Sequence, residues 1–211
     1  MYDKGRFLTF EGIDGAGKTT AILELAEYLR QLGLDVLILR EPGGTEIGEQ
    51  IRNLLLEQRN EAMSDKCELL LFAAARAELT ETVIKPAIEA GQVVICDRFT
   101  DSTVAYQGFG RGLSEEMVSQ LNRIATGGLE AQRTFYMDLT VEVAGQRLAN
   151  RSDKAEDRLD QEGMDFQRKV REGYLSQAEK YPERIYTVDA DRDTEAIVDE
   201  MLNVLKEDWK L

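Results

Sequence analysis

A glycine-rich segment near the N-terminus has the residue types and the spacing to bind a chain of phosphates. The run Gly12-Ile13-Asp14-Gly15-Ala16-Gly17-Lys18-Thr19 fits the pattern G-x-x-x-x-G-K-[ST]; it follows a short apolar run and opens a helical pattern, the context this motif requires. Glycines let backbone N–H groups converge on phosphate oxygens, and the positive end of the helix dipole adds to the attraction. We therefore predict that this run and Thr20 bind the phosphates of a nucleoside triphosphate.

Three side chains in or near this segment suit phosphoryl-transfer chemistry. Lys18 is expected to bridge the β- and γ-phosphates. The hydroxyl of Thr19 can bind Mg²⁺, and Asp97 is the candidate acidic partner that holds the water shell of the ion. Asp97 also follows an apolar run, so an ordinary strand-end cap is the alternative for that residue.

Short apolar runs alternate with amphipathic stretches along the chain, which predicts an α/β fold with a five-stranded parallel sheet and helices on both faces. The expected strands are Phe7–Phe10, Val36–Leu39, Val93–Cys96, Phe135–Leu139 and Ile185–Val188. The expected helices are Lys18–Leu32, Thr45–Gln58, Asp65–Ala90, Ser114–Thr126, Val141–Asn150, Phe166–Lys180 and Thr194–Lys206. Asp65 with Glu68 three residues later resembles a capping box, and Ser114 starts another capped helix; both are structural signals.

Ligands of open parallel sheets bind beyond the carboxyl ends of the strands, so the residues after each apolar run matter most for function. Residues that could bind a ligand or take part in catalysis follow four of the five expected strands. They are Glu11–Thr20, Arg40–Thr45, Asp97–Gly112 and the segment that begins at Asp138.

The composition narrows the class of protein. At 211 residues with 43% hydrophobic content, the chain should form a single domain over residues 1–211. A net charge of −14 disfavours nucleic acid and anionic membranes as partners, and no apolar stretch approaches transmembrane length. Cys67 and Cys96 lack metal-ligand spacing and no histidine is present, so we expect buried, reduced thiols in a cytoplasmic protein.

A phosphate loop alone leaves a GTPase, a motor ATPase and a small-molecule kinase open, and other motifs decide between them. No N-K-x-D segment for reading guanine follows Lys18, and a motor ATPase normally has a longer chain. The order and spacing of several further motifs resemble the bacterial thymidylate kinase family over nearly the whole chain. The motifs are Glu11-Gly12, Arg40-Glu41-Pro42-Gly43-Gly44-Thr45, Ala74-Ala75-Arg76, Asp97-Arg98-Phe99, Ala105-Tyr106-Gln107-Gly108 and Gly110-Arg111-Gly112.

This resemblance implies a P-loop nucleoside monophosphate kinase that uses ATP, Mg²⁺ and dTMP and forms a homodimer. Arg98 is implied to contact the acceptor phosphate, for which a guanidinium fork that stays charged is suited. Phe72 and Arg76, one helical turn apart, are implied to lie along the thymine ring, where Arg76 can donate to O4 but would oppose the amino group of cytosine. Further implied contacts to dTMP come from Asp14 at the sugar 3′-hydroxyl, Glu41, Pro42, Arg52, Thr103, Tyr106 beside C2′, and Gln107 at N3.

Each of these residues also has an ordinary structural explanation. On periodicity alone Phe72 would be a core residue and Arg76 a solvated charge, and Arg98 could pair with a carboxylate at the sheet edge. Gln107 cannot choose between pyrimidines by itself, because its amide can flip.

A polar segment at about residues 147–163 is expected to form a mobile lid. The phosphate loop has Gly15 and Ala16 where some family members carry an arginine, so the resemblance implies that the lid supplies the cation for the transferred phosphoryl group. We assign that role first to Arg158 and second to Arg151.

The predicted reaction is ATP plus dTMP giving ADP plus dTDP, which serves dTTP synthesis. The acceptor phosphate is already anionic near neutral pH, so positioning and charge neutralisation suffice and no general base is needed. Two alternatives remain open at this stage: a kinase of the same fold for another substrate, such as a free deoxynucleoside, and a P-loop protein that only senses nucleotide.

Overall fold

A five-stranded sheet forms the centre of the molecule in the computed structural model, which describes residues 5–57, 62–150, 158–159 and 162–210. The strands are β1 (Arg6–Glu11), β2 (Val36–Arg40), β3 (Val93–Asp97), β4 (Arg133–Asp138) and β5 (Ile185–Asp189). All four strand pairings are parallel, and the strand order is β2-β3-β1-β4-β5. The predicted α/β class and all five predicted strands are therefore confirmed.

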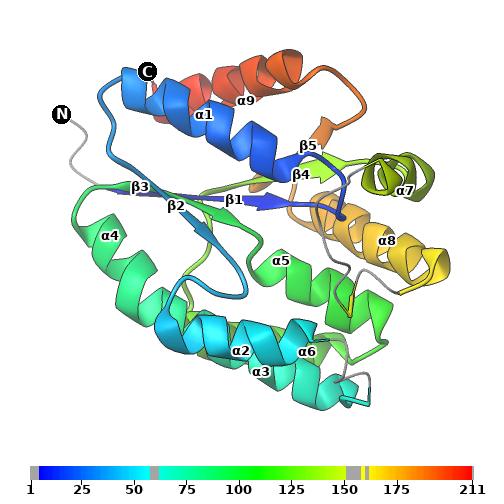
Figure 1. Cartoon of the computed structure of the whole chain (residues 1–211). Coiled ribbons are helices and arrows are strands. Elements are labelled where there is room, and N and C mark those ends of the chain that lie inside the picture. Colours follow the sequence, from blue (N-terminus) through cyan, green and yellow to red (C-terminus); the bar gives the residue numbers. More distant parts are fainter. Residues whose placement is uncertain (1–4, 58–61, 151–157, 160–161, 211) are drawn as a thin grey trace.

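Helices cover both faces of this sheet, as Figure 1 shows, with α1 and α9 above it and α3, α4, α5 and α8 below it. The helices are α1 (Lys18–Gln31), α2 (Glu46–Leu56), α3 (Asp65–Leu79), α4 (Lys85–Glu89), α5 (Thr100–Thr103), α6 (Glu115–Thr126), α7 (Val141–Ala149), α8 (Met164–Lys180) and α9 (Thr194–Trp209). Two π-helical segments, η2 (Thr80–Ile84) and η3 (Val104–Gly110), continue α3 and α5.

The alternation of side chains along β1 explains why helices are needed on both faces. Leu8 and Phe10 belong to the core on the side of α1 and α9, whereas Phe7 packs with Leu79 and Ile84 in the core on the side of α3. All five side chains are no more than 1% exposed. A strand that is apolar on both faces can be buried only between two helical layers.

The long helix predicted for Asp65–Ala90 is interrupted. It comprises α3, the π-helical segment η2 and α4, in which Pro86 lies in the first turn. Proline has no N–H to donate to the preceding turn, and the chain passes through a wider turn before it, where the N–H of Lys85 bonds to the carbonyl of Thr80. The pattern predicted one helix because the apolar residues continue through the interruption.

The segment after β3, which the sequence predicted as a strand edge with candidate functional residues and no helix, is helical as α5 and η3. This helix packs along α8, and Gly173 of α8 allows the close approach, since a Cβ there would lie 2.8 Å from Cα of Ala105. Gly108 and Gly110 concealed the helical pattern in the sequence. Tertiary packing overrides their low helix propensity.

Two smaller expectations for α3 were wrong. The helix is capped by Ser64, whose Oγ accepts from the N–H of Cys67, so Asp65 and Glu68 form no capping box. The carboxylate of Glu68 is instead buried among other side chains. Cys67 is exposed in the first turn of α3, and only Cys96 is the buried thiol that was expected.

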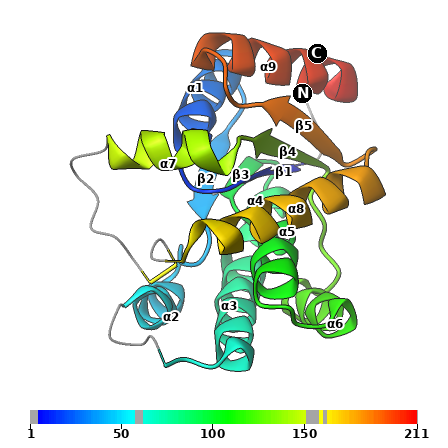
Figure 2. The same ribbon diagram turned by 90° about the vertical axis from the view of Figure 1, so that its right-hand side faces the viewer.

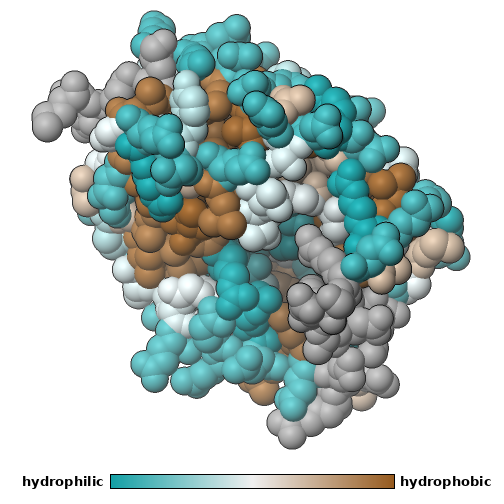
Figure 3. Space-filling model, turned by 45° about the horizontal axis from the view of Figure 1, so that its top comes forward, coloured by the Kyte–Doolittle hydropathy of each residue, from teal (hydrophilic) through white to brown (hydrophobic). Residues whose placement is uncertain are grey.

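The carboxyl ends of the strands meet at one edge of the sheet. Figure 2 looks towards this edge, where α8 crosses in front between α7 and α5. Figure 3 shows another face, on which hydrophilic side chains are spread widely and apolar ones gather in separate patches. In the described residues, no helix has both the length and the apolar character that crossing a membrane requires.

Candidate active site

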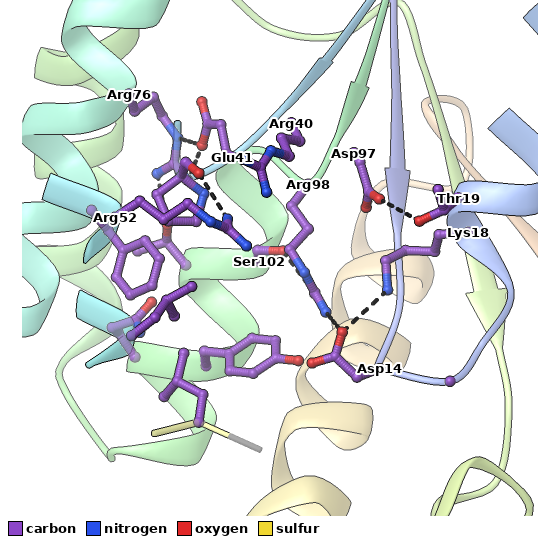
Figure 4. A pocket seen from close by; sticks show the side chains of 18 of the residues that line it. Asp14, Lys18, Thr19, Arg40, Glu41, Arg52, Arg76, Asp97, Arg98 and Ser102 are labelled. Atoms are coloured by element: carbon purple, nitrogen blue, oxygen red, sulfur yellow. Dashed lines mark hydrogen bonds and ion pairs between the residues drawn. The ribbon is translucent and has the colours of Figure 1, made fainter. Parts of the chain in front are cut away.

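A cavity of 340 Å³ opens at the carboxyl edge of the sheet, between the phosphate loop and α2, α3 and η3. Figure 4 shows Lys18, Asp14 and Arg98 on one side of it and Glu41, Arg76 and Arg52 on the other. The residues that line it are Asp14, Gly15, Gly17, Lys18, Thr19, Arg40, Glu41, Pro42, Arg52, Leu56, Phe72, Arg76, Asp97, Arg98, Ser102, Thr103, Tyr106, Gln107 and Leu159.

The loop between β1 and α1 forms the phosphate-binding end. Nζ of Lys18 donates to the carbonyls of Gly12 and Ile13, 3.0 Å from each, which folds the side chain back over the loop. Burial of Lys18, together with the charge of Arg98, lowers the pKa of its ammonium below 10.5. A buried cation that has one weak ion pair, at 4.0 Å from Asp14, is well placed to receive an anionic ligand.

The start of α1 differs from the starts of several other helices. Hydroxyls of Thr45, Ser64, Ser114 and Thr140 cap α2, α3, α6 and α7. The cap of α1 is Gly17, which has a left-handed backbone with φ of 86° and provides no side-chain hydrogen bond. Its N-terminal N–H groups can therefore serve a phosphate. The side chains of Ile13 and Ala16 are buried, so only their backbone groups are available to a ligand, and Thr20 is exposed on α1.

Thr19 and Asp97 come together as the sequence predicted for a metal site. Oγ1 of Thr19 lies 3.3 Å from Oδ2 of Asp97. The other oxygen, Oδ1, is buried without a hydrogen-bond partner. No group of three or more metal-binding side chains occurs in the part of the chain that the structure describes. One hydroxyl and one carboxylate suit Mg²⁺, which keeps several waters and takes its remaining ligands from phosphates.

Arg98 lines the cavity beside Asp14 and Lys18. Its backbone φ of 72° is in the left-handed region, which is strained for a residue other than glycine and often marks a functional site. Nη1 donates to the carbonyl of Gly12 at 3.0 Å and to the hydroxyl of Tyr174 at 2.9 Å, and Nη2 donates to Asp14 at 3.0 Å. Asp14 thus links the guanidinium to the phosphate loop.

Behind Arg98 lies a buried network that the sequence did not predict. The carboxylate of Glu11 accepts from the N–H of Phe99 at 2.7 Å, from the hydroxyl of Ser102 at 2.6 Å and from that of Tyr174 at 3.0 Å. Burial, and then the charge of Asp101, raise the pKa of Glu11 to about 7. Glu11 belongs to the motif Glu11-Gly12, which predicts no role for its carboxylate, and Tyr174 lies in a helix with no motif, so no sequence signal identifies the network.

The opposite wall of the cavity is built around Arg76. This side chain is 1% exposed, so it is not the solvated charge that periodicity alone suggested. Four of its N–H groups donate to protein acceptors: Nε to Oε2 of Glu41 at 2.8 Å, Nη1 to the side-chain oxygens of Thr103 and Asn122, and Nη2 to the carbonyl of Phe99. Nη2 also forms an ion pair with Oε2 of Glu41 at 2.7 Å. Its role in reading the base stays a prediction, because a bond to the base requires one of these partners to give way.

The other residues predicted to bind dTMP also line the cavity. Phe72 is half-buried on the same helix as Arg76. The Tyr106 hydroxyl and Oε1 of Glu41 are buried without hydrogen-bond partners. Arg52 donates to the carbonyl of Pro42 at 2.8 Å.

In the part of the chain that the structure describes, no arginine of the predicted lid lies at the phosphate loop. Arg151 lies outside the described residues, as does most of the segment predicted as a lid. Arg158 is 6% exposed and donates to the carbonyl of Leu55 at 2.9 Å and to Glu68 at 2.5 Å. Arg147 is directed at Ala190 and Asp191 instead.

Some lining residues were missed and one predicted edge is not part of the cavity. Arg40, Ser102, Leu56 and Leu159 line the cavity but were not proposed as site residues. Arg40 could have been found, since it opens the second motif at the carboxyl end of β2. Asp138, at the fourth strand edge, does not line the cavity and pairs with Arg171 at 2.8 Å.

A parallel sheet with a phosphate loop after β1, and a cavity that continues from this loop to a wall of arginines and an aromatic ring, define a P-loop kinase of the nucleoside monophosphate class. Comparison with known proteins narrows this class. Residues 10–201 match the sequence model of the family described as thymidylate kinase.

Individual relatives agree with that match. The thymidylate kinase of Desulfovibrio desulfuricans is 49% identical over 91% of each chain, and that of Chlorobaculum tepidum is 51% identical over 87% of this chain and 88% of its own. The crystal structure of thymidylate kinase from Ehrlichia chaffeensis superposes with a TM-score of 0.78 at 36% identity, covering 96% of this chain and 98% of that one.

The chain therefore belongs to the thymidylate kinase family. It is an ATP-dependent phosphotransferase, and the reaction of its family is the phosphorylation of dTMP.

Proposed function

We propose that the cavity binds the phosphates of ATP at Lys18 and dTMP between Arg98 and Phe72, and that the γ-phosphoryl group is transferred between them to give ADP and dTDP for dTTP synthesis. The observation that carries this proposal is the position of Asp14, which lies 3.0 Å from Nη2 of Arg98 and 4.0 Å from Nζ of Lys18. The two cations are thus next to each other, although one belongs to the donor end and the other to the acceptor end.

The proposed mechanism is an in-line attack of an acceptor phosphate oxygen on the γ-phosphate. Lys18 neutralises charge between the β- and γ-phosphates, and Arg98 holds the acceptor phosphate in place. No residue needs to remove a proton, since the acceptor oxygen is already anionic. This agrees with a chain that contains no histidine.

Mg²⁺ fits the donor set of Thr19 and Asp97, and we propose that these residues hold it. When bound with ATP, the ion would neutralise charge on the triphosphate. The unpaired oxygen of Asp97 is the group that such an ion, or its bound water, would satisfy.

For the nucleoside of dTMP, Phe72 offers a stacking face and Tyr106 crowds the 2′ position of the sugar, which favours deoxyribose. Asp14 serves the 3′-hydroxyl and Arg52 the monophosphate, while Glu41, Pro42 and Thr103 complete the wall. We keep Arg158 first and Arg151 second for the transferred phosphoryl group. For Arg158, this role requires its guanidinium to leave Glu68.

We also propose that the protein is a cytoplasmic homodimer. Leu70 of α3 is 55% exposed and Ile124 of α6 is 75% exposed, and these two helices pack against each other. Exposed apolar side chains on adjoining helices support an interface with a second copy of this chain.

The test of the proposed function is a steady-state assay of ADP production with ATP and dTMP, dUMP, dCMP or thymidine. Preferred use of dTMP is the expected result. Preferred use of thymidine would favour the deoxynucleoside kinase, and absence of ADP production with every acceptor would favour a nucleotide sensor.

A further inference from the structure

A buried carboxylate, that of Glu68, lies beneath the part of the cavity where Gln107 is. Its side chain is 1% exposed. Oε1 accepts from Nε2 of Gln107 at 2.8 Å and from Nε of Arg111 at 3.2 Å. Oε2 accepts from Nη2 of Arg111 at 3.1 Å and from Nη2 of Arg158 at 2.5 Å. Four donors thus converge on one carboxylate.

This environment keeps Glu68 ionised. Burial acts to raise its pKa, but the hydrogen bonds from Arg111, Gln107 and Arg158 outweigh burial, and the pKa lies below 4.5. An ionised carboxylate accepts hydrogen bonds and donates none. Gln107 must therefore turn its NH₂ group towards Glu68, since the flipped amide would set oxygen against oxygen.

The consequence concerns the other end of the amide. Nε2 donates to Glu68, which puts Oε1 on the side of the amide that faces away from Glu68, and Gln107 lines the cavity. Thymine and uracil carry a hydrogen on N3, whereas N3 of cytosine is an acceptor. A fixed acceptor at this position accepts from N3–H of thymine and opposes N3 of cytosine.

We propose that Glu68 is a specificity-determining positioning residue: by binding Nε2 of Gln107 it fixes the amide so that Oε1 faces pyrimidine N3, which selects bases with N3–H over cytosine. This inference rests on the proposed use of dTMP at this site. It removes the ambiguity that Gln107 alone could not resolve. Arg76 already donates four hydrogen bonds to protein acceptors, whereas Gln107 needs no protein partner to give way before it meets the base.

The decisive variant is Glu68→Gln. Its amide oxygen should occupy the position of Oε2, where Nη2 groups of Arg111 and Arg158 both donate. Its NH₂ group then faces Gln107, whose amide must flip and present NH₂ to the cavity. We expect the ratio of kcat/KM for dTMP to that for dCMP to fall at least about tenfold, because the site now offers a donor to N3.

Two controls separate positioning from general disturbance. Asp65→Asn removes a carboxylate of the same helix that lies 3.7 Å from Arg111. Nε2 of Gln107 donates to Glu68, so this variant should leave the ratio unchanged. Gln107→Met removes the amide itself. In that background Glu68→Gln should change the dTMP to dCMP ratio no further, because Glu68 is proposed to act only through Gln107.

The outcomes are distinct. Wild-type protein that does not phosphorylate dTMP contradicts the proposed function. If the wild type is active and Glu68→Gln does not change the dTMP to dCMP ratio, the proposed role of Glu68 is wrong. The role is also wrong if Glu68→Gln lowers this ratio equally in the Gln107→Met background. Should Glu68→Gln not fold, Glu68→Asp shortens the side chain and withdraws the carboxylate from Gln107, and a smaller fall in the ratio is expected, because the amide is then free to flip but not forced to.

Discussion

The guanidinium of Arg76 and the carboxylate of Glu41 form an ion pair of 2.7 Å in the interior, where their side chains are 1% and 4% exposed. The pair joins the loop after β2 to α3, so it shapes the wall of the cavity. Burial acts to raise the pKa of Glu41, and the charge and hydrogen bonds of Arg76 act against it. The two residues therefore depend on each other for stability as well as for any contact with the base.

Arg76→Gln should destabilise the fold, because it leaves the Glu41 carboxylate buried without its counter-charge. We expect a loss of about 3–5 kcal/mol in the free energy of unfolding, measured by urea denaturation. The double variant Glu41→Gln, Arg76→Gln should lose less, since no charge remains. A double variant as unstable as Arg76→Gln would contradict this account.

The same Arg76→Gln variant tests base reading under conditions where it stays folded. If Arg76 donates to O4 of thymine, the substitution should weaken use of dTMP and narrow the gap to dCMP, because glutamine can present a donor or an acceptor. The measurement is kcat/KM for both substrates. An unchanged ratio would show that Arg76 holds the wall and does not read the base.

Lys18→Ala should lower the rate of phosphoryl transfer at least about a hundredfold, because the ammonium neutralises charge between the β- and γ-phosphates. Binding of dTMP, followed by thermal shift, should persist. Lys169→Ala, an exposed lysine of α8, is the matched control and should retain activity. Near-normal turnover by Lys18→Ala would contradict the assignment of this segment as the phosphate-binding loop.

Asp97→Asn should raise the Mg²⁺ concentration needed for half-maximal activity by about tenfold, because one anionic partner of the ion or its waters is lost. Removal of Mg²⁺ with a chelator should abolish transfer in the wild type. If Asp97→Asn and the wild type need the same Mg²⁺ concentration for half-maximal activity, Asp97 does not hold the ion and is an ordinary strand-end cap.

The sheet and the phosphate loop could be predicted from the sequence because their signals are local. An apolar run followed by glycines, Lys18 and a helical pattern needs no knowledge of distant residues. The network of Glu11, Ser102 and Tyr174 could not be predicted, because its members come from β1, α5 and α8 and meet only through packing.

Glu68 illustrates the same limit. Its spacing from Asp65 matched a local capping pattern, and that pattern gave no hint of partners 39, 43 and 90 residues away. Arg158 was assigned by resemblance to the phosphoryl group, whereas here its guanidinium binds Glu68. Long-range contacts of this kind follow from the fold and not from residue spacing.

Arg158→Ala should lower kcat more than it raises the apparent binding constant of dTMP, since a cation that acts on the transferred phosphoryl group contributes mainly in the transition state. Steady-state kinetics with dTMP varied at saturating ATP is the measurement. Arg158→Lys, which keeps the charge, should recover part of the rate. If Arg158→Ala leaves kcat unchanged and Arg151→Ala lowers it, Arg151 and not Arg158 is the main cation for the transferred phosphoryl group.

Glu11 should make stability depend on pH. Burial and the charge of Asp101 raise its pKa from 4.5 to about 7, against hydrogen bonds from Ser102 and Phe99 and the charge of Arg98. The folded protein then holds this proton more tightly than the unfolded chain does. The contribution of Glu11 is therefore most favourable below pH 4.5 and is lost as the pH rises to about 7.

Glu11→Gln removes that titration, so the melting temperature of the variant minus that of the wild type should increase as the pH rises from 4.5 to about 7 and then level off. Thermal unfolding over this pH range gives the measurement. Glu24→Gln, which changes an exposed carboxylate on α1, is the matched control and should follow the wild type at every pH. Curves for Glu11→Gln and the wild type that stay parallel across the range would mean that Glu11 titrates alike in the folded and unfolded states, and the buried network would then not hold its proton.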